Sequence, residues 1–297
     1  MSKIIIDKPI RGELHENISL SDYTSWRVGG PATYLYRPAD AHDLADFLTQ
    51  VPERLPIIWI GLGSNLLVRD CGVAAVVIAT QGRLTGFDKV TDNIVRIEAG
   101  VACAKAARGC ARNSLTGVEF LAGVPGTIGG ALAMNAGCFG GETWNHVIKV
   151  ETVNRKGEII ERTPDEFEIA YRSVVKPADE WFLAGYFQLS PGDKDKSLQQ
   201  IRELLDRRAS TQPTGEPSCG SVFRNPPGDH SARLIEACGL KNYAIGGARV
   251  SPKHANFIVN DGNASAADIE QLINHVRQEV EAAHGVCLIP EVHIIGD

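Results

Sequence analysis

The chain has 297 residues and a formal net charge of −6; hydrophobic residues make up 43% of it and charged residues 22%. This composition is typical of a globular protein whose core needs no disulfide or metal for stability, and the length predicts two domains or one large domain with a smaller one. The acidic balance excludes an obvious basic face for nucleic acid. No apolar run approaches the ~18 residues that a bilayer-spanning helix needs.

The first two thirds of the chain predict one helix and several strands. Asp40 is a candidate N-cap, because the apolar residues that follow it recur at helical spacing. Residues 154–157 (Asn-Arg-Lys-Gly) carry turn chemistry between two apolar segments, which predicts a β-hairpin. Short apolar runs and alternation predict strands at residues 56–60, 73–79, 94–99, 147–153, 158–160 and 181–189.

The last third predicts three helices and two strands. A helix around residues 198–205 should end before the Pro/Gly-rich segment 212–217, which we interpret as a domain boundary. Ser265 and Asp268 form a predicted capping box for the last helix, which Gly285 should end. The other predicted elements are a helix around residues 234–238 and strands at residues 254–260 and 286–295. Because strands and helices mix without regular βαβ repetition, the sequence predicts an α+β fold.

The seven cysteines are odd in number and include no C-x-x-C pair. This pattern argues against a disulfide framework or a zinc cluster and favours a reducing cytoplasm. We expect most of them to act as small buried hydrophobic residues. They are Cys71, Cys103, Cys110, Cys138, Cys219, Cys238 and Cys287.

Residues 117–141 contain eight of the 30 glycines of the chain. Such density costs backbone entropy, so another interaction must offset it. One explanation is a phosphate site, because Gly126-Thr127-Ile128-Gly129-Gly130 could place backbone N–H groups at a helix N-terminus. The alternative is a structural turn with close helix packing, and the pattern alone does not decide between the two.

A second glycine motif, Gly61-Leu62-Gly63-Ser64-Asn65, follows a predicted buried strand. It lacks the third glycine and the acidic residue of a Rossmann dinucleotide site, and the chain has no P-loop motif. Two candidate phosphate cradles in one chain still fit a ligand with a pyrophosphate, such as a dinucleotide.

Motifs along nearly the whole chain together resemble those of the UDP-N-acetylenolpyruvoylglucosamine reductase (UDP-N-acetylmuramate dehydrogenase) family. No single motif is decisive, but their joint order and spacing are highly specific. The motifs are residues 24–30 (TSWRVGG), 61–68 (GLGSNLLV), 123–131 (GVPGTIGGA), 134–137 (MNAG), 171–173 (YRS), 220–226 (GSVFRNP), 254–257 (HANF) and 290–292 (PEV).

The resemblance implies an FAD-binding fold of the vanillyl-alcohol-oxidase type in two subdomains, followed by a C-terminal α+β substrate-binding domain. On this basis we expect residues 1–72 to form the first FAD-binding subdomain, joined by a C-terminal strand at 286–297. The second FAD-binding subdomain should cover residues 73–195. Residues 196–212 should form a connecting helix, and residues 213–285 the substrate-binding domain.

The resemblance also implies a cytoplasmic flavoenzyme of bacterial peptidoglycan precursor synthesis. In this family NADPH reduces non-covalently bound FAD, and the flavin N5 hydride then goes to the β-carbon of the enolpyruvyl ether of UDP-N-acetylglucosamine. Protonation of the α-carbon gives UDP-N-acetylmuramate. We expect a small-molecule substrate, no nucleic acid, membrane or metal partner, and a monomer.

Three catalytic residues follow from the resemblance. Ser221 resembles the proton donor; a hydroxyl is a weak acid, but the carbanion is strongly basic. Arg172 resembles the arginine that contacts the enolate carboxylate, which its planar fork matches. Glu291 resembles the catalytic glutamate, and strand alternation would place it on the face of Cys287 and Ile289, where an apolar surrounding favours the protonated form. Without the family, these would be a turn serine, a surface arginine and an edge-strand glutamate.

The remaining site residues are assigned by the same resemblance. Cofactor binding is assigned to Gly61, Leu62, Gly63, Ser64, Asn65, Leu66, Gly123, Val124, Pro125, Gly126, Thr127, Gly129, Gly130, Asn135, Ala136 and Gly137. Substrate binding is assigned to Tyr171, Arg208 and Asn225, and a solvated helix face is an equally good interpretation for Arg208.

Two features depart from the family pattern. One branch of the family has an inserted loop whose tyrosine covers the substrate, but Ser221 follows Arg172 by only 49 positions, which indicates the shorter branch. Cys219 stands where alanine is expected.

Two other functions are alternatives to this interpretation. A sugar or alcohol oxidase of the same fold often attaches FAD covalently through histidine, and the glycine-rich segment has no histidine before His146. A UDP-sugar transferase or nucleotide-binding module would lack flavin absorbance.

Overall fold

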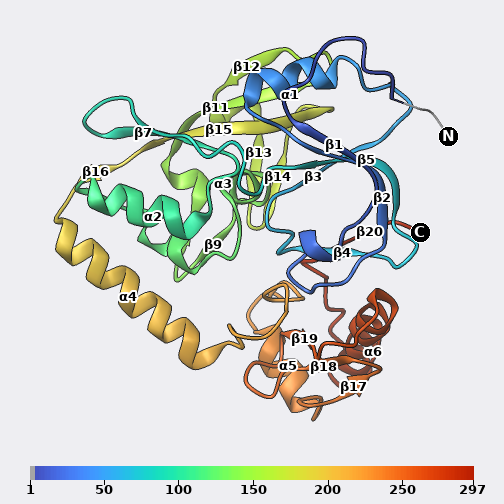
Figure 1. Cartoon of the computed structure of the whole chain (residues 1–297). Helices are drawn as coiled ribbons and strands as arrows, with labels where there is room; N and C mark the ends of the chain where they lie inside the picture. Colours follow the sequence, from blue (N-terminus) through green and yellow to red (C-terminus); the bar gives the residue numbers. More distant parts are fainter. Residues whose placement is uncertain (1–3) are drawn as a thin grey trace. The chain divides into compact units, whose positions relative to one another are not determined.

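The computed structural model describes residues 4–297 as two compact units, coloured along the sequence in Figure 1. Unit 1 contains the described residues up to Glu16, then Tyr34–Leu62 and Ala75–Asp206; unit 2 contains Asn17–Thr33, Gly63–Ala74 and Arg207–Asp297. The predicted division into two FAD-binding subdomains and a substrate-binding domain stays a prediction, and residues 1–3 of its first range lie outside the described residues.

A four-stranded sheet of order β1-β2-β5-β3 lies mainly in unit 1. Its strands are β1 (Glu13–Ser19), β2 (Pro31–Arg37), β5 (Val73–Ala79) and β3 (Ile57–Ile60), and β3 pairs with β5 in parallel. Helix α1 (Ala41–Leu48) follows β2, and the Asp40 carboxylate accepts a hydrogen bond from the N–H of Asp43, as the N-cap prediction requires. The buried face of α1 includes Phe47, whose ring stacks on Tyr36 at a centroid distance of 3.7 Å.

The second sheet of unit 1 is antiparallel, with the order β12-β11-β15-β7-β6. Its strands are β12 (Ile159–Arg162), β11 (Val147–Asn154), β15 (Glu180–Gln188), β7 (Ile94–Glu98) and β6 (Phe87–Lys89). The hairpin predicted at residues 154–157 is confirmed, because Val153 pairs with Ile159 across it. The strands predicted within residues 4–200 are confirmed to within a residue or two at each end.

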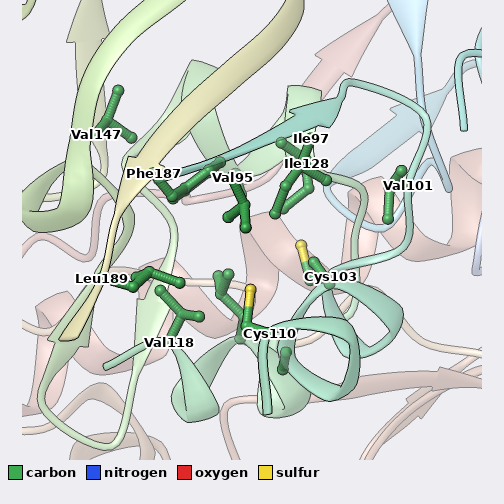
Figure 2. Packing of buried hydrophobic residues seen from close by; sticks show 14 of the residues in the cluster. Val95, Ile97, Val101, Cys103, Cys110, Val118, Ile128, Val147, Phe187 and Leu189 are labelled. Atoms are coloured by element: carbon green, nitrogen blue, oxygen red, sulfur yellow. The ribbon is translucent and has the colours of Figure 1, made fainter. Parts of the chain in front are cut away.

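Helices α2 (Cys103–Arg112) and α3 (Ile128–Met134) pack against this sheet and bury the main core of unit 1. Figure 2 shows Val95, Ile97 and Phe187 of the sheet gathered with Cys103 and Cys110 of α2. Because α2 has alanine or cysteine at its buried positions, the helix can lie close to the strands.

Unit 2 is built on helix α6 (Ala266–His284), which packs against α5 (Ser231–Ala237) and a three-stranded sheet. The sheet has the order β17-β18-β19, with strands at Ala244–Ile245, Ala248–Val250 and Ile258–Asn260. The predicted capping box is present, since the Ser265 hydroxyl accepts from Asp268 N–H and the Asp268 carboxylate accepts from Ser265 N–H. Gly285 ends the helix with a φ of +67°, as predicted. The parallel pair of β20 (His293–Ile295) and β4 (Leu66–Val68) adds a second small sheet.

The remaining elements are short, apart from helix α4 (Lys194–Thr211). The strands are β8 (Leu115–Thr116), β9 (Gly137–Cys138), β10 (Gly141–Glu142), β13 (Glu168–Ala170), β14 (Ser173–Val175) and β16 (Ser190–Pro191). The 3-10 helices are η1 (Ser21–Tyr23), η2 (Glu119–Gly123), η3 (Thr143–His146) and η4 (Pro164–Glu166).

Two predicted strands of the last third are shorter than expected. Residues 254–257 form a turn, closed by a 3.0 Å hydrogen bond from Phe257 N–H to the His254 carbonyl, so the strand begins only at Ile258. Residues 286–292 are irregular, and the strand begins at His293.

Because residues 286–292 are irregular, the surroundings of Glu291 differ from those predicted for a regular strand. Cys287 and Ile289 are exposed, Ile289 by 61%, while Leu288 and Val292 are buried. Glu291 therefore does not share an apolar strand face with Cys287 and Ile289. Strand alternation failed here because the segment is fixed by bonds to another part of unit 2, described below.

All seven cysteines are free thiols. Cys103, Cys110 and Cys219 are buried, Cys138 and Cys238 are half-buried, and Cys71 and Cys287 are exposed, so the expectation that most of the cysteines are buried is wrong. Across residues 4–297, no helix combines the length and the apolar character that crossing a membrane would require.

Candidate active site

The glycine-rich segment of unit 1 turns into α3 with Thr127 at the N-cap. The first N–H groups of the helix are already used, because Ile128 donates to the Val101 carbonyl at 2.9 Å and Gly129 donates to the Ala99 carbonyl at 2.8 Å. Close packing accounts for Gly129, since a Cβ there would lie 2.9 Å from the Ala99 Cβ. These two positions fit the structural alternative that the sequence left open.

Gly130, unlike Gly129, is not closely packed against another part of unit 1. The position that a Cβ would take at Gly130 has only the Thr127 hydroxyl within 4 Å, at 3.9 Å, so the helix leaves open space there. Gly130 is exposed, so this space is open to solvent, and a ligand could approach the backbone there beside the Thr127 hydroxyl. The surroundings of Gly130 and Thr127 are thus compatible with a bound group.

The first glycine of the second motif lies directly against this turn. A Cβ on Gly61 would lie 2.3 Å from the Thr127 hydroxyl oxygen, so only glycine lets the end of β3 reach Thr127. The structure therefore brings Gly61 next to the start of α3 within unit 1. The first glycine of one candidate phosphate motif thus adjoins Thr127 of the other.

The hairpin of β13 and β14 carries Tyr171 and Arg172 at its tip. The Arg172 guanidinium donates from Nη2 to the Gly137 carbonyl at 2.6 Å and from Nη1 to the Asn135 carbonyl at 3.4 Å. It also lies 5.1 Å from the centre of the Tyr171 ring, which is half exposed. The predicted carboxylate-binding arginine and the Asn135–Ala136–Gly137 motif are therefore neighbours.

Asn135 is buried at the end of α3 and has a left-handed φ of +44°. Its Nδ2 donates to the Glu142 carboxylate at 2.9 Å, and its Oδ1 accepts from Trp144 N–H at 3.1 Å. These bonds fix the turn on which Arg172 rests. In the structure the Asn135 side chain supports the local backbone, and its predicted contact with a cofactor is untested.

In unit 2, the segment after Ser221 runs antiparallel to the segment that contains Glu291. Glu291 N–H donates to the Val222 carbonyl at 2.7 Å, and Arg224 N–H donates to the Ile289 carbonyl at 2.9 Å. Phe223 and Pro290 form the β-bridge between these two bonds. Ser221 and Glu291, separated by 70 positions in the sequence, are thus brought to adjoining backbone segments.

The second glycine motif continues in unit 2 and supports Glu291 from another direction. Asn65 Nδ2 donates to the Glu291 carbonyl at 3.0 Å, and His293 N–H donates to the Asn65 carbonyl at 3.0 Å. Gly63 has a φ of +59°, and a Cβ there would meet the Tyr23 carbonyl at 2.0 Å. The turn at Gly63 therefore packs tightly against the backbone at Tyr23, which holds Asn65, two positions further along the chain, in place.

Cys219 lies two positions before Ser221 in the sequence and is buried. Burial raises the pKa of its thiol well above the ordinary value, and the negative charge of Glu291 raises it further. The thiol is thus neutral at neutral pH and is not suited to act as a nucleophile.

Asn225 and Arg208, the two predicted substrate-binding residues of unit 2, form hydrogen bonds within the protein. Asn225 Oδ1 accepts from Ser231 N–H at 3.2 Å, which places it at the start of α5. Arg208 donates from Nε to Gln212 at 3.0 Å along α4. Their predicted contacts with the substrate stay predictions.

Sequence reasoning gave no role to Asn256, which it noted only within a motif. The structure shows its buried side chain bonded to both main-chain groups of Phe223, two residues from Ser221. A polar residue between the apolar residues Ala255 and Phe257 was the available signal.

Comparisons with known proteins cover nearly the whole chain. A family model described as "UDP-N-acetylenolpyruvoylglucosamine reductase, C-terminal domain" matches residues 212–295, and one described as "FAD binding domain" matches residues 32–163. The UDP-N-acetylenolpyruvoylglucosamine reductase of Legionella pneumophila (strain Corby) is 59% identical over 288 residues, which are 97% of this chain and 94% of that relative.

Solved structures agree with these matches. The crystal structure of UDP-N-acetylenolpyruvylglucosamine reductase from Thermus caldophilus has a TM-score of 0.83 at 32% identity, and the match covers 97% of this chain and 100% of that chain. The 6-hydroxy-D-nicotine oxidase of Arthrobacter nicotinovorans, with a TM-score of 0.56 at 13% identity over 95% of this chain and 89% of that chain, shares the fold alone. The predicted α+β class and FAD-binding fold are confirmed.

Proposed function

Because this chain belongs to the UDP-N-acetylenolpyruvoylglucosamine reductase family, we propose that it reduces the enolpyruvyl ether of UDP-N-acetylglucosamine to UDP-N-acetylmuramate. FAD is the cofactor of the family and NADPH its reductant. We propose that this chain uses the same pair, acts in the cytoplasm in peptidoglycan precursor synthesis, and works as a monomer.

The residues around Thr127 are proposed to hold the cofactor. The open position at Gly130, the Thr127 hydroxyl and the adjoining Gly61 support this assignment, because they combine backbone access with a hydrogen-bond donor. FAD, when bound, supplies hydride transfer that no side chain can perform, taking a hydride from NADPH and giving it to the β-carbon of the substrate.

Ser221 is proposed to supply the proton that completes the reduction. Hydride addition at the β-carbon leaves an electron pair on the α-carbon, delocalised into the carboxylate, and this carbon takes the hydroxyl proton. Gly220, with a φ of +74°, turns the chain just before Ser221, and the following residue is tied to Glu291. The main-chain bond between Glu291 and Val222, the residue that follows Ser221, is the observation that carries the proposal.

Arg172 and Glu291 are proposed to stabilise the negative charge that develops on the carboxylate. Arginine offers a two-point contact, and a glutamic acid in its protonated form could donate a hydrogen bond. The apolar strand face that would have favoured the protonated form is absent, so the role of Glu291 rests on the family motif and on its position beside Ser221.

An anaerobic experiment in two stages tests the proposed function. The purified protein should show flavin absorbance that NADPH bleaches, and UDP-N-acetylglucosamine enolpyruvate should then restore it with formation of UDP-N-acetylmuramate. A colourless protein that binds no added FAD, or a reduced flavin that this substrate does not reoxidise, would contradict the proposal.

A further inference from the structure

We propose that Asn256 is a positioning residue that fixes the backbone shared by Ser221 and Glu291; this inference rests on the proposed function. Asn256 is only 3% exposed. Its Oδ1 accepts from Phe223 N–H at 3.0 Å, and its Nδ2 donates to the Phe223 carbonyl at 2.8 Å. Its main-chain carbonyl accepts from Val222 N–H at 2.9 Å.

These bonds hold Val222 and Phe223 from one side, while Glu291 holds the Val222 carbonyl from the other. Asn256 therefore reaches both proposed catalytic residues through one short segment. Ser221 is attached to Val222 covalently, and Glu291 is attached to it by the 2.7 Å bond. A shift of this segment would move the serine and the glutamate together or apart.

The chain before Ser221 makes this support necessary. Ser218 forms a β-bridge with Val259, and regular pairing then stops until Val222 bonds to Asn256. Gly220 lies between them with a φ of +74° and has no atom within 4 Å of its missing Cβ. Because little packs against this turn at Gly220, the position of the Ser221 hydroxyl depends on how firmly the two ends are fixed.

The side chain at position 256 must both donate and accept a hydrogen bond. Phe223 presents a buried donor and a buried acceptor, and only a side chain with both functions can satisfy them together. An unpaired buried group costs more than a hydrogen bond contributes. Alanine would leave both groups of Phe223 without this partner, and a carboxylate would offer acceptors alone.

The central test measures the two half-reactions of Asn256→Ala separately by anaerobic stopped flow. Displacements near 1 Å can reduce a rate on the order of 10²-fold, so flavin reoxidation by the enolpyruvyl substrate should fall by at least about tenfold. Flavin reduction by NADPH should change by less than about twofold, because it does not use Ser221. Amide hydrogen exchange of Phe223 should become faster, which provides a readout independent of turnover.

Asn260→Ala is the matched control. Asn260 is also buried, at 6% exposure, and its side chain also bonds main-chain groups: Nδ2 donates to the Trp26 carbonyl at 2.8 Å, and Oδ1 accepts from Gly262 N–H at 2.7 Å. This variant should lower thermal stability without a selective loss of flavin reoxidation.

Asn256→Asp gives a pH profile that a purely structural role would not produce. A protonated carboxyl has one donor and one acceptor, like the amide, whereas a carboxylate cannot donate to the Phe223 carbonyl. Reoxidation in Asn256→Asp should therefore be close to normal below the pKa of the introduced acid and fall as the pH rises through it. The wild-type chain should lack this step.

Three results would overturn the inference while the wild-type chain still reduces the enolpyruvyl substrate. They are unchanged reoxidation in Asn256→Ala, an equal loss in both half-reactions, or failure of both Asn256 variants to fold when Asn260→Ala folds. If the wild-type chain itself does not reduce this substrate, the proposed function fails instead.

Discussion

The main-chain N–H of Glu291 donates a 2.7 Å hydrogen bond to the carbonyl oxygen of Val222, the residue that directly follows Ser221. Backbone bonds of this kind do not depend on side-chain identity, so variants at Ser221 or Glu291 should keep the local fold. The two residues can therefore be altered one at a time, and a change in activity can be assigned to the missing side-chain chemistry.

Glu291→Gln should lose flavin reoxidation by the enolpyruvyl substrate and keep NADPH oxidation. The glutamine amide still has N–H groups, but it is a much weaker acid than a carboxylic acid and donates a weaker hydrogen bond to the developing negative charge. Removing a donor aimed at such charge typically costs 10²–10³-fold, roughly the reduction we expect in the second half-reaction. Glu279→Gln, on an exposed part of α6, serves as the control and should leave both half-reactions intact. An equal loss in both half-reactions of Glu291→Gln would remove the proposed role.

Gly220→Ala should be destabilising although it has room for a methyl group. The cost arises from the φ of +74°, because L-residues in the left-handed region lose about 1–2 kcal/mol. Gly215 also has open space and no positive φ, so Gly215→Ala should change the free energy of unfolding by less than about 0.5 kcal/mol. Urea unfolding of both variants checks this, and equal stabilities would show that the turn does not require glycine.

Gly61→Ala should reduce FAD retention because the new Cβ would collide with the Thr127 hydroxyl, 2.3 Å away. Thr127→Ala removes both the colliding hydroxyl and the proposed hydrogen-bond donor to FAD, so the loss in the double variant should be smaller than the sum of the two single losses. A double-mutant cycle on flavin content after gel filtration measures this coupling. Strict additivity would mean that Gly61 and Thr127 do not constrain each other in solution.

The cysteines should react with a thiol reagent in an order set by burial. Burial raises the pKa of Cys103 and of Cys110 to about 12, so their reactive thiolates are scarce at pH 8 and become common only near that pKa. Cys71 and Cys287 are exposed and should be labelled first. Mass spectrometry of a time course checks the order; early labelling of Cys103 would contradict the buried core in Figure 2.

Local signals explain what the sequence predicted well. The capping box of Ser265 and Asp268 and the N-cap at Asp40 act within one helical turn, so neighbouring residues determine them. The hairpin at residues 154–157 is similarly local. Family motifs then identified the catalytic candidates, which no periodicity could have found.

Long-range backbone bonds explain what the sequence could not predict. Residues 286–292 have an apolar composition that is typical of a strand, but their conformation is fixed by bonds to Val222 and Arg224, more than 60 positions away. The N–H groups of Ile128 and Gly129 look available for phosphate in the sequence, yet Val101 and Ala99 use them. The bonds of Asn256 to Phe223, 33 positions apart, are of the same kind.

The most direct test of the account is proton delivery in Ser221→Ala, with Ser218→Ala as the neighbouring control. Reduced wild-type protein is mixed anaerobically with the enolpyruvyl substrate in deuterium oxide, and flavin absorbance and deuterium at the α-carbon of the product are followed together. We predict rapid reoxidation with deuterium at that carbon in the wild type and in Ser218→Ala. In Ser221→Ala we predict normal reduction by NADPH and reoxidation slowed on the order of 10²–10⁴-fold. Reoxidation and deuterium incorporation at the wild-type rate in Ser221→Ala would contradict the assignment of Ser221 as the proton donor.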